Sequence, residues 1–93
     1  MTGRGHRLSP WAALAAWPEG YFTASYEGRR YGVTRSVHAG GRSMKLYAEE
    51  LGGADRVSLN IFASTSGEPM LKPCEMPLDK VTAFVFEAVP EAA

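Results

Sequence analysis

Apolar and polar side chains alternate along residues 20 to 62, and glycines interrupt the alternation at intervals. A period of two is that of β-strands with one face buried and the other in water. We expect four strands, beginning near residues 21, 30, 43 and 57. Glycines near positions 28, 40 and 52 supply the turns, because glycine accepts the positive φ that tight hairpins require. The pattern therefore predicts an antiparallel β-meander.

A short helix is predicted before the first strand. Ser9 is a suitable N-cap, and Pro10 has the fixed φ that suits the first helical position. The helix should end near Trp17, because the residue before a proline is biased away from helical φ and ψ. Its apolar side is expected to hold Trp11, Leu14 and Ala15.

A second helix is predicted directly after Pro77, where Asp79 suits the positive end of the helix dipole. Apolar side chains then recur at helical spacing, namely Leu78, Val81, Phe84, Val85 and Ala88. We expect this stripe to cover the apolar face of the sheet, with Lys80, Thr82 and Glu87 in solvent. The predicted fold class is α+β: a four-stranded antiparallel β-meander with a short N-terminal helix and a C-terminal amphipathic helix packed on one sheet face.

Length bounds the domain organisation. A chain of 93 residues is expected to form one domain, because two cores of half that size would each bury too little apolar surface. Residues 1–8 are basic and lack apolar anchors, so we expect a disordered tail there. The single α+β domain is predicted over residues 9–89, followed by a C-terminal tail at 90–93.

Charge is balanced over the whole chain but not along it. Residues 1 to 47 hold seven Arg and Lys against two Glu, and residues 48 to 93 hold three against eight acidic residues. Segregated charge is typical of a surface that attracts an oppositely charged partner. The alternative is that neighbouring strands pair these opposite charges across the sheet.

Arg35 interrupts the second strand, because its parity points it toward the apolar face. Either a bulge shifts the register, near Gly32, or the guanidinium reaches water past an edge of the sheet.

The polar face of the predicted sheet is the best candidate for binding. It gathers aromatic side chains among basic ones, which suits unpaired bases stacked on rings with cations near the phosphates. The candidate residues are Tyr21, Arg30, Lys45, Tyr47 and Phe62. The alternative is that the N-terminal helix lies over these rings through Trp11, Leu14 and Trp17 and forms a second small core.

The sequence contains few residues that could form a catalytic or metal-binding site. Cys74 is the only cysteine, and His6 and His38 are the only histidines. Cys74 lies beside Glu75 and away from the features that lower a thiol pKa, so we expect a partly buried packing cysteine. One Cys and two distant His match no usual metal-ligand spacing. We expect no enzyme, no cofactor and no metal.

No secretory leader and no apolar stretch of membrane-spanning length is recognisable, so we expect a cytoplasmic protein that does not insert into a membrane. A single cysteine cannot form an intrachain disulfide, which agrees with a reducing compartment.

Three segments, residues 29–34 (RRYGVT), 46–53 (LYAEELGG) and 71–77 (LKPCEMP), together resemble a family of short uncharacterised bacterial proteins. The resemblance covers about residues 20 to 86 and implies no function. In element order the chain is also similar to the single-stranded-DNA-binding transcriptional coactivator domain. There a loop with Gly, Glu and Lys-Pro precedes the closing helix, as Gly67-Glu68 and Lys72-Pro73 do here. Likeness of element order alone does not assign function.

From these observations we expect a non-enzymatic binding module. One hypothesis is protein–protein interaction or self-association as a homodimer, through a strand edge or the aromatic face. The alternative hypothesis is a single-stranded nucleic-acid-binding domain that uses the aromatic and basic sheet face.

Overall fold

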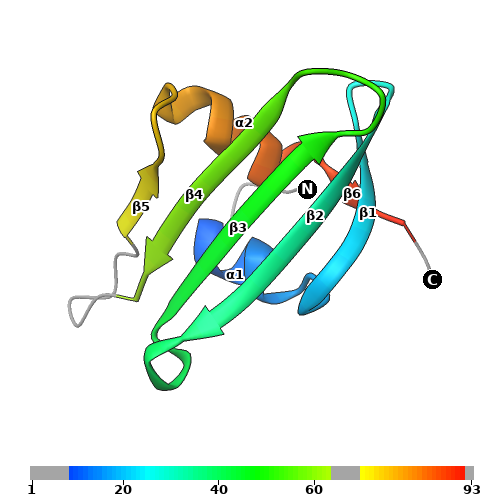
Figure 1. The fold of residues 1–93 in the computed structure, drawn as a ribbon. Coiled ribbons are helices and arrows are strands. Elements are labelled where there is room, and N and C mark those ends of the chain that lie inside the picture. The colour runs from blue at the N-terminus through cyan, green and yellow to red at the C-terminus, as the bar shows by residue number, and fades with distance from the viewer. Residues whose placement is uncertain (1–8, 64–69, 92–93) are drawn as a thin grey trace, which may run out of the picture.

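The computed structural model describes residues 9–63 and 70–91. Its elements, shown in Figure 1, are α1 (Pro10–Ala15), β1 (Gly20–Tyr26), β2 (Arg29–His38), a 3₁₀ turn (Ala39–Gly41), β3 (Ser43–Glu50), β4 (Arg56–Phe62), β5 (Met70–Pro73), α2 (Leu78–Glu87) and β6 (Val89–Pro90). The strands form one antiparallel sheet in the order β5-β4-β3-β2-β1-β6. The α+β class, the meander and both helices agree with the sequence prediction. The expected tail at residues 1–8 lies outside the described residues.

The sheet has six strands in the described residues, so the prediction of four strands is wrong. β5 pairs with β4, and β6 pairs with β1 at the opposite edge. These strands have four and two residues and each ends in proline, which is too little sequence to show an alternation. The sheet continues past the expected start of the C-terminal tail, since Pro90 belongs to β6 and the Glu91 amide bonds to the Thr23 carbonyl at 2.9 Å.

The hairpins have the geometry that their sequences favour. Between β1 and β2, Glu27 and Gly28 have φ of 54° and 76°, the positive pair of a two-residue turn that matches strand twist. The register then runs without interruption from Gly20 opposite Arg35 to Tyr26 opposite Arg29. An unbroken register means that parity along each strand decides which face every side chain takes.

Both helices pack on the same face of the sheet, as Figure 1 shows. Leu14 of α1 and Phe84 of α2 are fully buried against the inward side chains of the central strands. Trp17, just after α1, contacts Phe22 and Phe84 edge to face at 5.8 and 6.0 Å. The sequence alternative in which α1 covers the polar face is therefore wrong. Neither described helix is long and apolar enough to cross a membrane.

Arg35 points into the core, and neither predicted exit for it is correct. The pairing of β2 is continuous on both sides, so no bulge is present, and the residue is only 7% exposed. Its guanidinium donates to the carbonyl oxygens of Trp17 (2.8 Å) and Pro18 (3.2 Å) and to Met44 Sδ (3.0 Å). These two carbonyl groups lie just past the end of α1, where no helical N–H group is available to them. The Arg35 guanidinium supplies the missing hydrogen-bond donors.

The face of α2 differs in part from the predicted stripe. Val81, Phe84 and Val85 are buried as expected, but Leu78 is 54% exposed, because it lies on the outer side of the helix with Thr82 and Phe86. Lys80 is half-buried rather than free in solvent, and its Nζ contacts Asp55 Oδ1 at 2.5 Å.

Asp55, in the β3–β4 turn, also accepts a hydrogen bond from Tyr31 Oη at 2.7 Å. Hydrogen bonds from Lys80 and then Tyr31 lower the pKa of Asp55, whereas burial and the bond to Asp55 raise the pKa of Tyr31 to about 12. This polar cluster ties the first turn of α2 to β2.

Some basic residues of the first half of the chain form ion pairs with acidic residues of the second half across the sheet. Arg29 lies 3.8 Å from Glu50, and Arg30 lies 2.9 Å from Glu91. Both pairs join the basic first half to the acidic second half. Among the described residues these pairs support the cross-strand alternative.

Candidate functional site

The face of the sheet opposite the helices is not covered by any described element. We call it the open face, and define it by the outward residues Tyr21, Thr23, Arg30, Thr34, Ser36, His38, Ser43, Lys45, Tyr47, Glu49, Arg56, Ser58, Asn60, Phe62, Met70 and Lys72. Tyr21 is 67% exposed, Tyr47 37% and Phe62 41%. Exposed aromatic rings gathered on one side of a small domain are typical of a binding surface.

Strand pairing arranges the open face in rows that run across the sheet. One row is Tyr21, Thr34, Tyr47 and Ser58; the next is Ser36, Lys45, Asn60 and Lys72; the third is His38, Ser43, Phe62 and Met70. Successive rows on one face lie about 7 Å apart, because they are two residues apart along each strand. A row of lysines and an amide therefore lies between two rows that carry aromatic or apolar side chains.

Tyr21 lies flat on the sheet, because Gly32 leaves room for it. A Cβ atom built on Gly32 would be 2.5 Å from Tyr21 Oη and 3.2 Å from two atoms of the ring. The tyrosine therefore extends from β1 over the backbone of β2. One side of the ring rests on the chain and the other faces water, which is the geometry of a stacking platform.

Lys45 and Lys72 are both exposed and lie on either side of Asn60 in the register. Among the described residues neither lysine has a carboxylate within 4 Å. Their charges are available to an anionic ligand. Arg56 lies opposite Glu49 in the register, but among the described residues no ion pair joins the two side chains.

Arg30 differs from the other predicted site residues. Its Nε and Nη2 donate to the two oxygens of Glu91 at 3.1 and 2.9 Å, a bidentate pair, and Thr23 Oγ1 donates to the same carboxylate at 2.6 Å. The bonds from Arg30 and then Thr23 lower the pKa of Glu91 to about 2. The structure thus brings Tyr21, Lys45, Tyr47 and Phe62 together on the open face but leaves Arg30 at its margin, neutralised.

A small cavity of about 250 Å³ opens beside Tyr47. It is lined by Tyr47, Arg56, Ser58, Cys74, Glu75 and Met76. The Cys74 amide bonds to the Ser58 carbonyl at 3.0 Å, which holds the segment after β5 against β4. Cys74 is half-buried, and Asn60 Nδ2 donates to its sulfur at 3.7 Å.

The structure does not place Cys74 beside a described histidine, as a Cys–His nucleophile pair would require. His38 Nε2 lies 2.8 Å from Ser36 Oγ on β2. The register places His38 in the row of Ser43 and Phe62, at the end of β4, whereas Cys74 bonds to Ser58 near the start of that strand. His6 lies outside the described residues. Within the described parts of the chain, no three His, Cys, Asp or Glu side chains are arranged to hold a metal ion.

Sequence reasoning missed Lys72 and the cavity residues other than Tyr47. Lys72 belongs to the open face only because β5 pairs with β4, which places it opposite Asn60. The signal available was the alternation over residues 70–73, where Leu71 is half-buried and Met70 exposed. Four residues are too few for that alternation to identify a strand.

The edges of the sheet offer little for strand addition. β5 has four residues and ends at Pro73, and β6 has two and ends at Pro90. Short edge strands and prolines are features that block pairing with another chain.

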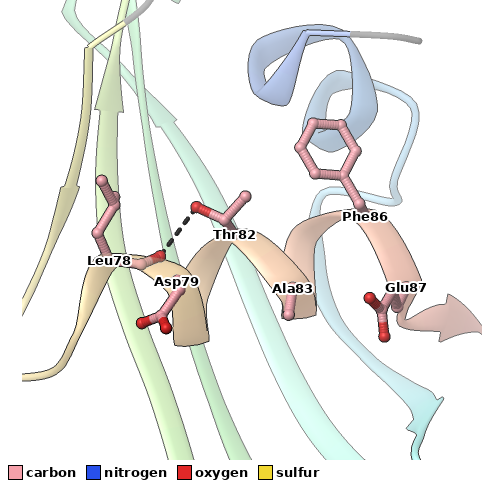
Figure 2. A pocket seen from close by; sticks show the side chains of 6 residues that line it. All are labelled: Leu78, Asp79, Thr82, Ala83, Phe86 and Glu87. Atoms are coloured by element: carbon pink, nitrogen blue, oxygen red, sulfur yellow. Dashed lines mark hydrogen bonds between the residues drawn. The ribbon is translucent and has the colours of Figure 1, made fainter. Parts of the chain in front are cut away.

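A second exposed surface lies on the outer side of α2. Figure 2 shows Leu78, Thr82 and Phe86 on one side of the helix, with Thr82 Oγ1 donating to the Leu78 carbonyl, and Asp79 and Glu87 on the other. These residues and Ala83 line a shallow hollow of about 440 Å³, and Phe86 is 41% exposed. The hollow is apolar at its centre and acidic at its margin.

The chain matches no protein-family model, no curated protein and no solved structure. The resemblances drawn from the sequence remain predictions, and function has to be argued from the surfaces described above.

Proposed function

We propose that the protein binds single-stranded nucleic acid on the open face of its sheet. The observation that carries the proposal is the placement of both helices on the other face, which leaves Tyr21, Tyr47 and Phe62 exposed. Bases of an unpaired strand stack on such rings without requiring a particular sequence.

The charges between the aromatic rows support the same function. Lys45 and Lys72 lie in the row between Tyr47 and Phe62, about 7 Å from each along the strands. A strand that stacks bases on both rows would bring its phosphates past these lysines. Two available lysines are few, so we expect modest affinity that falls as salt rises.

Fluorescence anisotropy with a labelled single-stranded oligonucleotide tests the proposal. Truncation of a stacked ring costs about 1–3 kcal/mol per base, so Phe62→Ala should weaken binding roughly 5- to 150-fold. Phe86→Ala is the matched control, because Phe86 is equally exposed but lies on α2, behind the sheet. Equal affinities of the two variants and the parent would overturn the proposal.

The salt dependence gives an independent measurement. Each phosphate neutralised on a single strand contributes about −0.7 to the slope of log K against log salt concentration. Joint substitution Lys45→Gln and Lys72→Gln should therefore reduce the slope by about 1.4. A slope near zero in the parent protein would show that phosphates are not contacted.

Self-association is the second candidate function, favoured by the exposed Leu78 and Phe86 on α2. Two-fold antiparallel pairing of α2 would place Leu78 opposite Phe86 of a second copy, but it would also place Asp79 near Glu87. Repulsion between these two carboxylates would oppose the contact. Because salt screens this repulsion, association should increase with salt concentration. Light scattering over a concentration series at low and high salt tests this, and a constant monomer mass in both would remove the candidate.

A further inference from the structure

We propose that the cavity beside Tyr47 is a base pocket selective for guanine, an inference that rests on the nucleic-acid-binding function proposed above. The cavity continues the row of Tyr21, Thr34, Tyr47 and Ser58 on the open face. A base leaving the stack on Tyr47 would therefore enter it without leaving the sheet. Its volume of about 250 Å³ is below the range of about 300–1,000 Å³ typical of drug-sized ligands, which suits a single ring system.

The lining brings a cation and an anion to the same small space. Arg56 comes from the start of β4, and Glu75 from the turn before α2, where its φ is 60°. Within residues 9–63 and 70–91, neither side chain makes a hydrogen bond or an ion pair with another residue. Glu49, the strand partner of Arg56, instead accepts a bond from Tyr47 Oη at 3.4 Å.

This pair of charges discriminates among the bases. A guanidinium fork binds two adjacent acceptors, and guanine presents O6 and N7 side by side. A carboxylate binds two adjacent donors, and guanine presents N1–H and its N2 amino group on the Watson–Crick edge. Adenine and thymine present neither pair, and cytosine lacks the pair of adjacent donors. Arg56 and Glu75 together therefore match guanine, with Ser58 available as a further donor or acceptor.

The remaining lining residues suit the flat surface of a base. The lining includes the aromatic residue Tyr47 and the sulfur-containing residues Cys74 and Met76. Sulfur is polarisable and packs well against aromatic rings.

A thymine oligonucleotide with a single central guanine tests the inference, because one guanine cannot form a quadruplex. Each good bidentate contact contributes about 1–3 kcal/mol of discrimination, so this oligonucleotide should bind at least 5-fold more tightly than the all-thymine strand. Replacing the guanine by 7-deazaguanine removes the N7 acceptor that faces Arg56. Replacing it by hypoxanthine removes the amino group that faces Glu75. Each analogue should lose most of the gain.

Matched variants assign each contact to its residue. Arg56→Lys keeps the charge but loses the fork, so it should abolish the 7-deazaguanine effect and preserve binding to the all-thymine strand. Glu75→Gln should abolish the hypoxanthine effect. Both residues are exposed, so the urea unfolding midpoints should not change.

The outcomes separate the two proposals. If all strands bind with equal affinity and the usual salt dependence, the guanine pocket is wrong and the general function stands. If the guanine preference survives both variants, the pocket is also wrong, because another site reads the base. If no strand binds at low salt, the proposed function fails and the pocket fails with it.

Discussion

The two faces of the sheet use aromatic residues in opposite ways. On the face covered by the helices, Phe84 contacts the rings of Trp17, Tyr26 and Tyr31 edge to face at 6.0, 5.0 and 5.2 Å. These rings pack against one another in favourable edge-to-face contacts and exclude water from the core. On the open face, Tyr21 and Tyr47 are separated by β2, and Phe62 lies beyond a row of lysines.

Charged groups show the same contrast. Arg35, on the covered face, is enclosed and bonded to main-chain carbonyls. Lys45, its neighbour one strand away on the open face, is exposed. Arg35 is occupied by hydrogen bonds to its own chain, whereas Lys45 and Lys72 on the open face have no carboxylate partner among the described residues. The comparison predicts that substitutions on the covered face change stability and those on the open face change binding.

The largest expected effect is that of Phe84→Ala. Removal of a fully buried phenyl ring at the centre of the aromatic cluster should lower the free energy of unfolding by about 3–5 kcal/mol. Phe62→Ala, on the open face, should lower it by less than about 1 kcal/mol. Urea unfolding followed by circular dichroism measures both, and comparable losses would show that the two faces do not differ as described.

Arg35→Leu should have the next largest effect. It removes three hydrogen bonds and leaves the carbonyl oxygens of Trp17 and Pro18 without these donors, at a cost of about 1–3 kcal/mol. Lys45→Leu makes the same chemical change on the open face and should alter stability by about 0.5 kcal/mol at most. If Arg35→Leu raises the free energy of unfolding in urea, the buried charge destabilises the protein, and its hydrogen bonds do not stabilise the packing of α1 on the sheet.

The sequence predicted the two faces well because their assignment depends on parity alone. Once β1 to β4 pair in sequential hairpins, alternation places Tyr21, Lys45, Tyr47 and Phe62 on one side. It also predicted that α2 covers the apolar face, but it left open which side α1 would take. The decision between the sides depends on packing of Leu14 and Trp17 against Phe84, a contact between segments 67 or more residues apart.

Long-range pairings explain the remaining differences. β6 has only two residues, and its sheet position depends on β1. The same pairing brings Glu91 to Arg30, which lies 61 residues earlier in the chain. No residue near Arg30 in the sequence therefore indicates that its charge is neutralised. Arg35 likewise finds its acceptors 17 and 18 residues earlier in the chain, where nothing near Arg35 in the sequence reveals them.

A smaller effect should appear at alkaline pH. The pKa of Tyr31 is raised to about 12 by burial and by its bond to Asp55, so folding favours the protonated phenol. The resulting stability is complete below the unfolded pKa of about 10 and is lost as the pH rises toward 12.

Tyr31→Phe should therefore flatten the fall in unfolding free energy between pH 10 and 12. At neutral pH, Tyr31→Phe should cost about 1 kcal/mol for the lost hydrogen bond, while Tyr47→Phe on the open face should cost about 0.5 kcal/mol or less. Identical alkaline limbs for the parent and Tyr31→Phe would contradict the role of the Asp55 bond.

The smallest expected effect concerns the one predicted site residue that its own chain neutralises. Glu91→Gln removes the carboxylate that Arg30 binds and leaves the guanidinium available at the margin of the open face. If an oligonucleotide crosses that margin, one further phosphate contact should steepen the salt slope by about 0.7. Glu87→Gln removes the same charge from the outer side of α2 and is the matched control. A change confined to Glu91→Gln shows that Arg30 contacts the strand, because a general effect of net charge would appear equally in both variants. Equal changes would instead place the strand away from β1 and confine the binding surface to the rows around Tyr47 and Lys45.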